Sequence, residues 1–320
     1  MNPYPIKCTP SYHGRIWGGT RLNTFFGYPI PSERTGEAWG ISDHPHGKST
    51  IANGYYQGRT IGELLEQHPD WFASRKLNRF PLLVKLLDAN DDLSVQVHPD
   101  DAFAAVYENG ELGKTECWYI VHAEPGAQIV YGHTARTREE LAEMIAAGRW
   151  DDLLIRVPVR TGDFFYIPHG TIHALGKGIV VLETQQNSDT TYRAYDYDRV
   201  DTSGCKRELH IEKVLQVTKV PFERPVIAPR RIDRGALLVT QYLAGPYFTV
   251  EKWTLQGTCE AQSRQHSFTL LSILAGVGRL RWADGELPLR KGDHLLIPRT
   301  LGGYTLSGEW EGIASCLPEA

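Results

Sequence analysis

The feature that most constrains the fold of this chain is the spacing of its glycines and prolines. Thirty-one Gly and 19 Pro interrupt the 320 residues, and between them lie many short runs rich in Val, Ile, Leu, Tyr and Phe. Short apolar runs bounded by turn-forming residues are typical of antiparallel β barrels and sandwiches. The sequence therefore predicts a mainly β protein. Helical periodicity predicts only a few short helices, at Thr60 to His68, Pro99 to Tyr107, Thr137 to Ala147 and around His210 to Val217.

A nine-residue pattern occurs twice. Arg160 to Pro168 reads RTGDFFYIP and Arg290 to Pro298 reads RKGDHLLIP. In each copy a Gly-Asp turn would lead into a short strand that ends at proline. We interpret the repeat as two related barrels, a catalytic one with small helical insertions at residues 1–220 and a second at 230–320, joined by the proline-rich stretch 221–229. Histidines follow only the first copy, so the second barrel is expected to be degenerate.

Charge and hydropathy exclude several classes of function. The formal net charge is -4 and no run of Lys and Arg occurs, which argues against nucleic acid as a partner. No apolar stretch reaches about 18 residues and the N-terminus lacks an export signal, which argues against a membrane partner. The five cysteines are scattered without a CxxC pair, as is typical of reduced thiols. We expect a cytoplasmic protein.

The segment Leu93 to Pro99 (LSVQVHP) carries three polar side chains at alternate positions. Because successive side chains of a strand point to opposite faces, Ser94, Gln96 and His98 are predicted on one face, and Leu93, Val95 and Val97 on the other. A solvated strand face would explain this pattern equally well. Two further segments favour a functional site.

Those two segments supply a carboxylate and a second imidazole. In KTECWYIV, residues 114–121, alternation places Lys114, Glu116, Trp118 and Ile120 on one face, although a surface ion pair is the simpler explanation. In GDFFYIPHGTIH, residues 162–173, a strand and a Pro-x-Gly bend lead to His173. Two imidazoles, a carboxylate and the amide oxygen of Gln96 form a plausible ligand set for a divalent metal. The two nitrogen ligands favour Zn over Ca or Mg.

These segments resemble a known family. Gly162-x5-Pro168-x-Gly170-x2-His173 fits the second cupin motif, and His98 with Glu116 fits the metal-binding part of the first. More narrowly, the chain resembles type I mannose-6-phosphate isomerases in their short bacterial form. The matching segments are RIWGG at 15–19, GEAWGIS at 36–42, FPLLVKLL at 80–87, LSVQVHPDD at 93–101, GKTECWYI at 113–120 and TQQNSDTTYRAYDYDR at 184–199. The implied fold is mainly β, with two tandem cupin (jelly-roll) barrels and a few short helices.

The resemblance also implies roles for individual residues. One Zn²⁺ per chain would be held by Gln96, His98, Glu116 and His173, and Arg193 would be the catalytic arginine. Lys85, Ser94, Lys114 and Glu183 would line the substrate pocket. At position 175, two residues after His173, this chain has Leu175 where longer relatives carry an aromatic residue. Substrate contacts there are expected to differ.

The implied reaction interconverts mannose 6-phosphate and fructose 6-phosphate by proton transfer through an enediol. Arg193 stays protonated and suits an electrostatic role, while Glu183 or a zinc-bound water is a candidate base. Lys85 lies in an apolar run and needs a partner there, such as the substrate phosphate, with Ser94 and Lys114 as further donors. The alternatives are another metal-dependent cupin enzyme, of oxygenase or epimerase type, and a non-catalytic sugar-binding cupin. The sequence leaves a monomer or a homodimer open.

Overall fold

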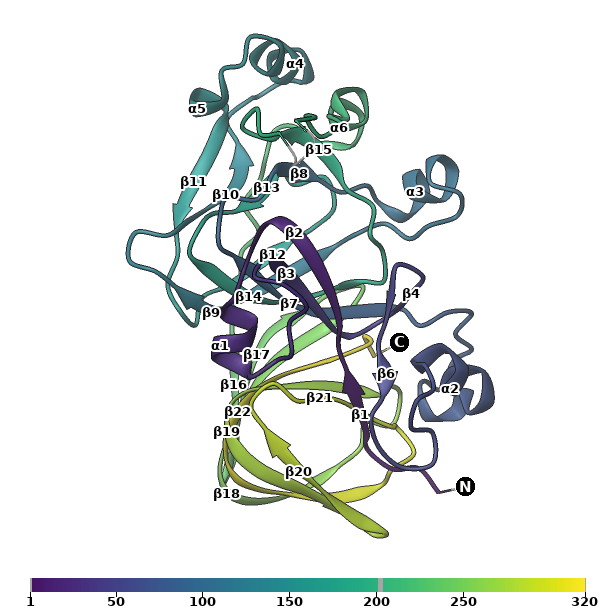
Figure 1. Cartoon of the computed structure of the whole chain (residues 1–320). Helices are drawn as coiled ribbons and strands as arrows, with labels where there is room; N and C mark the ends of the chain where they lie inside the picture. Colours follow the sequence, from purple (N-terminus) through teal and green to yellow (C-terminus); the bar gives the residue numbers. More distant parts are fainter. Residues whose placement is uncertain (1, 201–203, 320) are drawn as a thin grey trace.

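The computed structural model describes residues 2–200 and 204–319, and these form mainly antiparallel β sheets (Figure 1). The helices are short: α1 (Arg21–Phe26), α2 (Ile61–Gln67), the 3-10 turn η1 (Pro69–Trp71), α3 (Asp101–Tyr107), α4 (Arg138–Ala146), α5 (Trp150–Leu153) and α6 (Ile211–Val217). The predicted mainly β class and all four predicted helices are confirmed. Helices α1 and α5 were not predicted, because six and four residues are too few to show a periodic pattern.

Side-chain caps start three of the predicted helices. The Thr60 side chain accepts a hydrogen bond from the backbone N–H of Glu63, and Glu63 accepts one from Thr60 in return, which forms a capping box before α2. Asp100 caps α3 and Thr137 caps α4 in the same way, through a backbone N–H three residues later.

The first barrel is built from two sheets that face each other. One has the order β11-β10-β13-β8-β15 and the other β12-β9-β14-β7-β3-β2. Apolar residues of both inner faces, including Trp118, Ile129 and Val181, form one core between them. The strands are β2 (Ser11–Gly19), β3 (Thr35–Ile41), β7 (Leu82–Ala89), β8 (Val95–Val97), β9 (Glu116–Ala123), β10 (Gln128–His133), β11 (Leu154–Pro158), β12 (Phe164–Ile167), β13 (His173–Leu175), β14 (Ile179–Gln186) and β15 (Tyr192–Tyr195).

Helices α4 and α6 cover the outer face of the smaller sheet, at the top of Figure 1. Leu141 and Met144 of α4 and Val214 of α6 pack there against Val95 and Val97 of β8. This packing fixes which way β8 presents its other face. Gln96, the polar residue of β8, therefore points between the two sheets.

The second barrel is one large sheet with the order β16-β17-β18-β22-β19-β21-β1-β6, and β20 pairs with β19. Its strands are β1 (Ile6–Thr9), β6 (Thr50–Ile51), β16 (Arg230–Arg234), β17 (Leu237–Ala244), β18 (Thr249–Gln262), β19 (Thr269–Trp282), β20 (Gly285–Arg290), β21 (His294–Ile297) and β22 (Gly303–Cys316). Strands β1 and β6 come from the N-terminal part of the chain. The assignment of all residues 1–220 to the first barrel therefore needs correction, because Ile6–Thr9 pairs with His294–Ile297 of β21.

The repeated sequence pattern has the same backbone geometry in both copies. Gly162 and Gly292 have φ angles of 94° and 91°, a region that favours glycine. The backbone N–H of Arg160 donates to Asp163 Oδ2 at 2.8 Å, and that of Arg290 donates to Asp293 Oδ2 at 2.9 Å. The two turns lead into β12 and β21 respectively. This match supports the interpretation of two related barrels.

The barrels pack through an extensive apolar interface. Residues on the outer face of the larger sheet of the first barrel, such as Leu86 and Leu182, belong to one cluster with Phe248, Phe268 and Leu296 of the second. Within the described residues, no helix is long and apolar enough to cross a membrane.

Candidate active site

Three candidate site residues lie side by side on the inner face of the smaller sheet. Gln96 of β8 pairs with His173 of β13 on one side and with Arg193 of β15 on the other. Residues that are directly paired across antiparallel strands have neighbouring side chains. Strand pairing thus joins segments that are 77 and 97 positions apart in the sequence.

The predicted alternation of residues 93–98 is only partly correct. Val95 and Val97 pack outward under the helices as expected, but Leu93 belongs to the core between the two sheets. The reason is that β8 begins only at Val95, so strand alternation does not extend back to Leu93. Ser94 and Gln96 both line the cavity described below, as does Leu93.

The larger sheet supplies the opposite wall. Glu183 of β14 pairs with Lys85 of β7 and with Trp118 of β9, and Gln185 pairs with Glu116. Between the two walls lies a cavity of about 390 Å³. Its lining residues include six predicted site residues: Lys85, Ser94, Gln96, Lys114, Glu183 and Arg193. Leu175 lines it as well, at the position where an aromatic residue was expected from longer relatives.

His98, Glu116 and His173 form a buried group that could hold a metal ion. Glu116 lies 3.4 Å from His98 Nε2 through Oε2 and 3.2 Å from His173 Nε2 through Oε1. All three side chains are at most 1% exposed. Lys114, which lines the cavity, donates to His98 Nε2 at 2.9 Å and forms a close ion pair with Glu116.

Backbone carbonyls fix the orientation of both imidazoles. His98 Nδ1–H donates to the carbonyl oxygen of Thr190 at 2.8 Å, and His173 Nδ1–H donates to that of Thr171 at 2.8 Å. In a neutral imidazole the proton on Nδ1 leaves the lone pair on Nε2, and both Nε2 atoms face Glu116. This arrangement is typical of metal-binding histidines, whose second nitrogen is held by a hydrogen bond.

The charge states suit a cation. Burial and the nearby Lys114 lower the pKa of His98 to about 3, so this imidazole is neutral at pH 7. Burial by itself would raise the pKa of Glu116, but the Lys114 ammonium holds it well below its ordinary value. Glu116 Oε1 is buried and makes no hydrogen bond in the described part of the chain. Two imidazoles, with His98 neutral, and an anionic carboxylate with an unsatisfied oxygen fit a divalent metal.

Gln96 lies beside this group. Its side-chain amide nitrogen is 3.3 Å from His173 Nε2. The oxygen and nitrogen of an amide exchange places by a half-turn, so the same position also allows an oxygen ligand.

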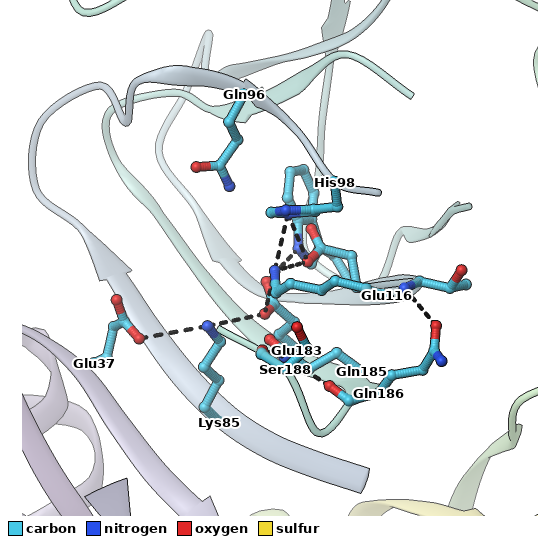
Figure 2. Close-up of polar contacts among 12 residues, drawn as sticks. Glu37, Lys85, Gln96, His98, Glu116, Glu183, Gln185, Gln186 and Ser188 are labelled. Carbon is cyan, nitrogen blue, oxygen red and sulfur yellow. Dashed lines mark hydrogen bonds and ion pairs between the residues drawn. The ribbon is translucent and has the colours of Figure 1, made fainter. Parts of the chain in front are cut away.

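A second network of buried charges lies on the larger sheet (Figure 2). Lys85 bridges two carboxylates, at 3.4 Å from Glu37 Oε2 and 3.1 Å from Glu183 Oε1. Two indoles hold these carboxylates, since Trp39 Nε1 donates to Glu37 at 2.6 Å and Trp118 Nε1 donates to Glu183 at 2.7 Å. Lys85 is thus paired, as its position in an apolar run required.

The network keeps both Glu37 and Lys85 charged. Burial would raise the pKa of Glu37, but Lys85 and Arg15 together hold it well below its ordinary value. Burial would lower the pKa of Lys85, but Glu183 and Glu37 more than offset this effect and raise it. Arg15 completes the network with a hydrogen bond of 2.6 Å to Glu37.

Several cavity residues were not identified as site residues from the sequence. Glu37, Arg15, Asp189, Thr191 and Arg207 all line the cavity. The segments 15–19 and 36–42 resembled the family, and this was the available signal for Arg15 and Glu37. No local pattern indicated Arg207.

Asp189 also belongs to a second histidine group, at the edge of the cavity. His44 lies on β4 (Asp43–His44), just before β5 (Gly47–Lys48), and comes close to His46 and Asp189. His46 Nδ1 is 3.0 Å from Asp189 Oδ2. In this group His46 is exposed and Asp189 is half-buried, whereas His98, Glu116 and His173 are all buried. The group is therefore a weaker metal candidate than the buried one.

The fold and the site together define a protein of two β barrels with a buried His-Glu-His group beside a charged cavity. Residues 5–119 match the family model for the catalytic domain of type I phosphomannose isomerase, and residues 239–317 match that for the cupin domain of mannose-6-phosphate isomerase.

Full-length relatives agree with these matches. The chain is 51% identical over 319 residues to mannose-6-phosphate isomerase ManA of Bacillus subtilis, which covers 99% of this chain and all of that protein. It is also 51% identical over 312 residues to mannose-6-phosphate isomerase of Streptococcus mutans, covering 97% and 98% of the two chains. A crystal structure of the B. subtilis mannose 6-phosphate isomerase superposes with a TM-score of 0.94 at 48% identity, covering 97% and 99%. The chain belongs to the type I mannose-6-phosphate isomerase family, as its sequence motifs indicated.

Proposed function

We propose that this chain interconverts mannose 6-phosphate and fructose 6-phosphate. The observation that carries the proposal is the buried group of His98, Glu116 and His173 beside a cavity lined by cations and carboxylates, in a chain that matches mannose-6-phosphate isomerases over its full length. An aldose-ketose isomerase must bind an anionic sugar, transfer a proton between neighbouring carbons and stabilise an enediol. The cavity offers groups for each of these tasks.

The metal in this proposal is one Zn²⁺ per chain, held by Gln96, His98, Glu116 and His173. Three observations support it: the two Nε2 lone pairs, the unsatisfied oxygen of Glu116 and the position of Gln96 beside His173. A zinc ion bound there would polarise a substrate oxygen and stabilise negative charge on it.

Glu183 is our candidate for moving the proton between C2 and C1. Its carboxylate lies in the cavity wall, where the Trp118 indole and Lys85 fix its position. A base held in one geometry loses little freedom when the substrate binds. Arg193, on the same face as Gln96, would stabilise the enediol with its permanent positive charge. Its Nε donates to Ser94 Oγ at 3.3 Å, which orients the guanidinium.

Lys85, Ser94 and Lys114 are proposed to bind the substrate, because all three line the cavity. Both lysines also contact carboxylates, so each has a fixed ammonium group for the substrate oxygens. The predicted cytoplasmic location and the choice between monomer and homodimer stay predictions.

The test is a coupled assay of fructose 6-phosphate formation from mannose 6-phosphate, before and after treatment with a chelator, with zinc, cobalt and manganese added back separately. We expect turnover that chelation abolishes and zinc restores. If cobalt or manganese restores turnover and zinc does not, the assignment of zinc as the metal is refuted. Absence of turnover in zinc-loaded protein would refute the isomerase and favour an oxygenase, an epimerase or a sugar-binding protein.

A further inference from the structure

The cations of the cavity are distributed unevenly between its two walls. On the wall formed by the larger sheet and Lys114, the charges balance. Arg15, Lys85 and Lys114 form ion pairs with three carboxylates, those of Glu37, Glu116 and Glu183. A phosphate dianion would gain little there, because each ammonium or guanidinium already has a carboxylate partner.

The wall beside β15 has an excess of positive charge. Asp196 accepts hydrogen bonds from Arg207 and from Arg199, so two guanidinium groups share one carboxylate. Arg193 is close by, and its side chain contacts Ser94 Oγ and the backbone oxygen of Glu208 rather than a carboxylate. Three guanidinium groups thus lie near one carboxylate. Two of them, Arg193 and Arg207, line the cavity, and so does the carboxylate of Asp189. The surplus of positive charge favours a phosphate ester, which carries nearly two negative charges at pH 7.

The electrostatics of Arg193 agree with this distribution. Burial and the neighbouring Arg207 lower the pKa of Arg193 from the ordinary value, so the nearby positive charge makes the Arg193 guanidinium more costly to hold charged. An anion between or beside the two would relieve that repulsion.

The position of this wall also suits the far end of a sugar phosphate. Gln96 pairs with Arg193. The backbone N–H of Arg193 in turn donates to His210 Nδ1, and the backbone N–H of His210 donates to the carbonyl oxygen of Arg193. The order across the face is therefore the buried His-Glu-His group, Gln96, Arg193 and then the segment that carries Arg207. In an extended hexose 6-phosphate, the phosphate lies at the opposite end from C1 and C2. With those carbons beside the candidate metal group, the phosphate extends past Arg193.

We propose that Arg207 anchors the phosphate group of the substrate, with the hydroxyl of Thr191 as a second donor. Both residues line the cavity. Asp196 takes the Nε and Nη2 donors of Arg207 and so fixes its guanidinium plane, which leaves Nη1 for the ligand. The proposal rests on the proposed function for its substrate. It reassigns the phosphate from Lys85 and Lys114, which would instead contact the sugar oxygens.

The first test compares Arg207→Ala with the unchanged protein in mannose 6-phosphate turnover. A charge-assisted hydrogen bond contributes enough that its loss raises KM by about 10- to 100-fold. We expect kcat to change less than about threefold, since the phosphate contact is the same in ground and transition states. Arg207→Lys, which keeps the charge, should recover part of the affinity. Zinc content and melting temperature of each variant show whether the site is intact.

Arg199→Gln is the matched control. Arg199 pairs with the same carboxylate as Arg207 but is not among the residues that line the cavity. Its KM should stay within about threefold of the unchanged protein, as expected for a screened charge that does not touch the ligand. An equal rise of KM in Arg199→Gln and Arg207→Ala, or a KM in Arg207→Ala within threefold, would overturn the assignment.

A binding experiment keeps the inference separate from the proposed function. Inorganic phosphate is titrated into each protein in a calorimeter. Its dissociation constant should be at least about tenfold larger for Arg207→Ala than for the unchanged protein, and intermediate for Arg207→Lys. This holds even if the unchanged protein does not turn over mannose 6-phosphate, in which case only the isomerase proposal fails. If Arg207→Ala does not fold, Arg207→Lys is compared alone. Equal phosphate binding by all the folded variants refutes the anchor.

Discussion

Replacing Lys85 tests whether the buried charge network holds the first barrel together. Lys85 connects Glu37 and Glu183, and the three side chains are 8%, 7% and 3% exposed. Lys85→Met keeps most of the apolar stem but leaves two buried carboxylates short of a partner. Removing one member of a buried ion pair typically costs about 3–5 kcal/mol. We expect the lower end, about 3 kcal/mol, because Glu37 keeps Arg15 and Glu183 keeps Trp118.

This loss should appear as a fall in melting temperature. For domains of 150–250 residues, 1 kcal/mol corresponds to about 2–4 °C, so roughly 6–12 °C is expected, measured by circular dichroism. Lys206→Met is the matched control, since Lys206 pairs with Asp198 at 2.6 Å but the two side chains are 64% and 77% exposed. Exposed pairs contribute about 0–1 kcal/mol, so its melting temperature should fall by no more than about 4 °C.

The pH dependence provides a further check with a definite sign. The depressed pKa of Glu37 stabilises the native state above the unfolded value of about 4.3, and this contribution is lost as the pH falls below it. The raised pKa of Lys85 stabilises the native state below the unfolded value of about 10.4, and this contribution is lost at higher pH. Both contributions are therefore constant between about pH 6 and 9. In Lys85→Met, Glu37 loses the larger of the two charges that offset its burial, so its pKa rises toward the ordinary value and its protonation costs less at low pH.

The difference in melting temperature between the unchanged protein and Lys85→Met should therefore shrink as the pH falls from 8 to 5. A difference below 3 °C at pH 8, or one that grows toward pH 5, would refute the argument. Both proteins are measured with the same metal content, so titration of the candidate ligands cancels in the difference.

Two predictions concern the candidate ligands and Arg193. His98→Ala should lose bound metal and turnover together, because it removes one of two imidazoles that face Glu116, and metal analysis that still finds one zinc per chain would contradict the ligand set. Arg193→Ala should keep its zinc, since Arg193 lies beyond Gln96, but lose about 100-fold or more in kcat if it stabilises the enediol. Near-normal kcat in a zinc-loaded Arg193→Ala would exclude that role.

The sequence predicted those parts of the site that depend on regular strands. Glu116, Trp118 and Ile120 share a face because β9 is regular from Glu116 to Ile120, before its register with β14 shifts, so simple alternation applies there. Alternation failed at Leu93, where the strand had not yet begun. Local rules also placed the capped helices, because Thr60, Asp100 and Thr137 mark their starts within three residues.

Contacts between distant segments could not be derived in this way. Glu37, Lys85 and Glu183 come together because β3, β7 and β14 are neighbours in one sheet, and the register between them is a property of the whole fold. The sequence suggested the substrate phosphate as a partner for Lys85. In the structure, Lys85 instead pairs with two carboxylates, those of Glu37 and Glu183. The same limit applies to β1, whose partner β21 lies almost three hundred residues away.

One close contact between the barrels lies at His294, the position in the second repeat that corresponds to Phe164 in the first. His294 is buried, with its Nε2 2.9 Å from the Tyr28 hydroxyl and its Nδ1 2.8 Å from Ser272 Oγ. Burial lowers the pKa of His294 to about 4, so it is neutral at pH 7. A methyl group added at Gly40 of β3 would overlap this imidazole. Gly40 therefore lets the first barrel approach the second.

Gly40→Ala should destabilise the protein by about 1–3 kcal/mol, as expected for overpacking in a closed interface. Gly14→Ala is the control on the neighbouring strand, where the added methyl would lie 3.7 Å from the Arg34 backbone oxygen, an ordinary contact. If the clash with His294 is the cause, the double variant Gly40→Ala/His294→Ala should be less destabilised than the sum of its single changes, by about 0.5–3 kcal/mol. Strictly additive losses in urea unfolding would mean that Gly40 and His294 act independently. Because Gly40 follows Trp39, which holds Glu37, a shift of β3 should also raise KM in Gly40→Ala, and the double variant should restore it.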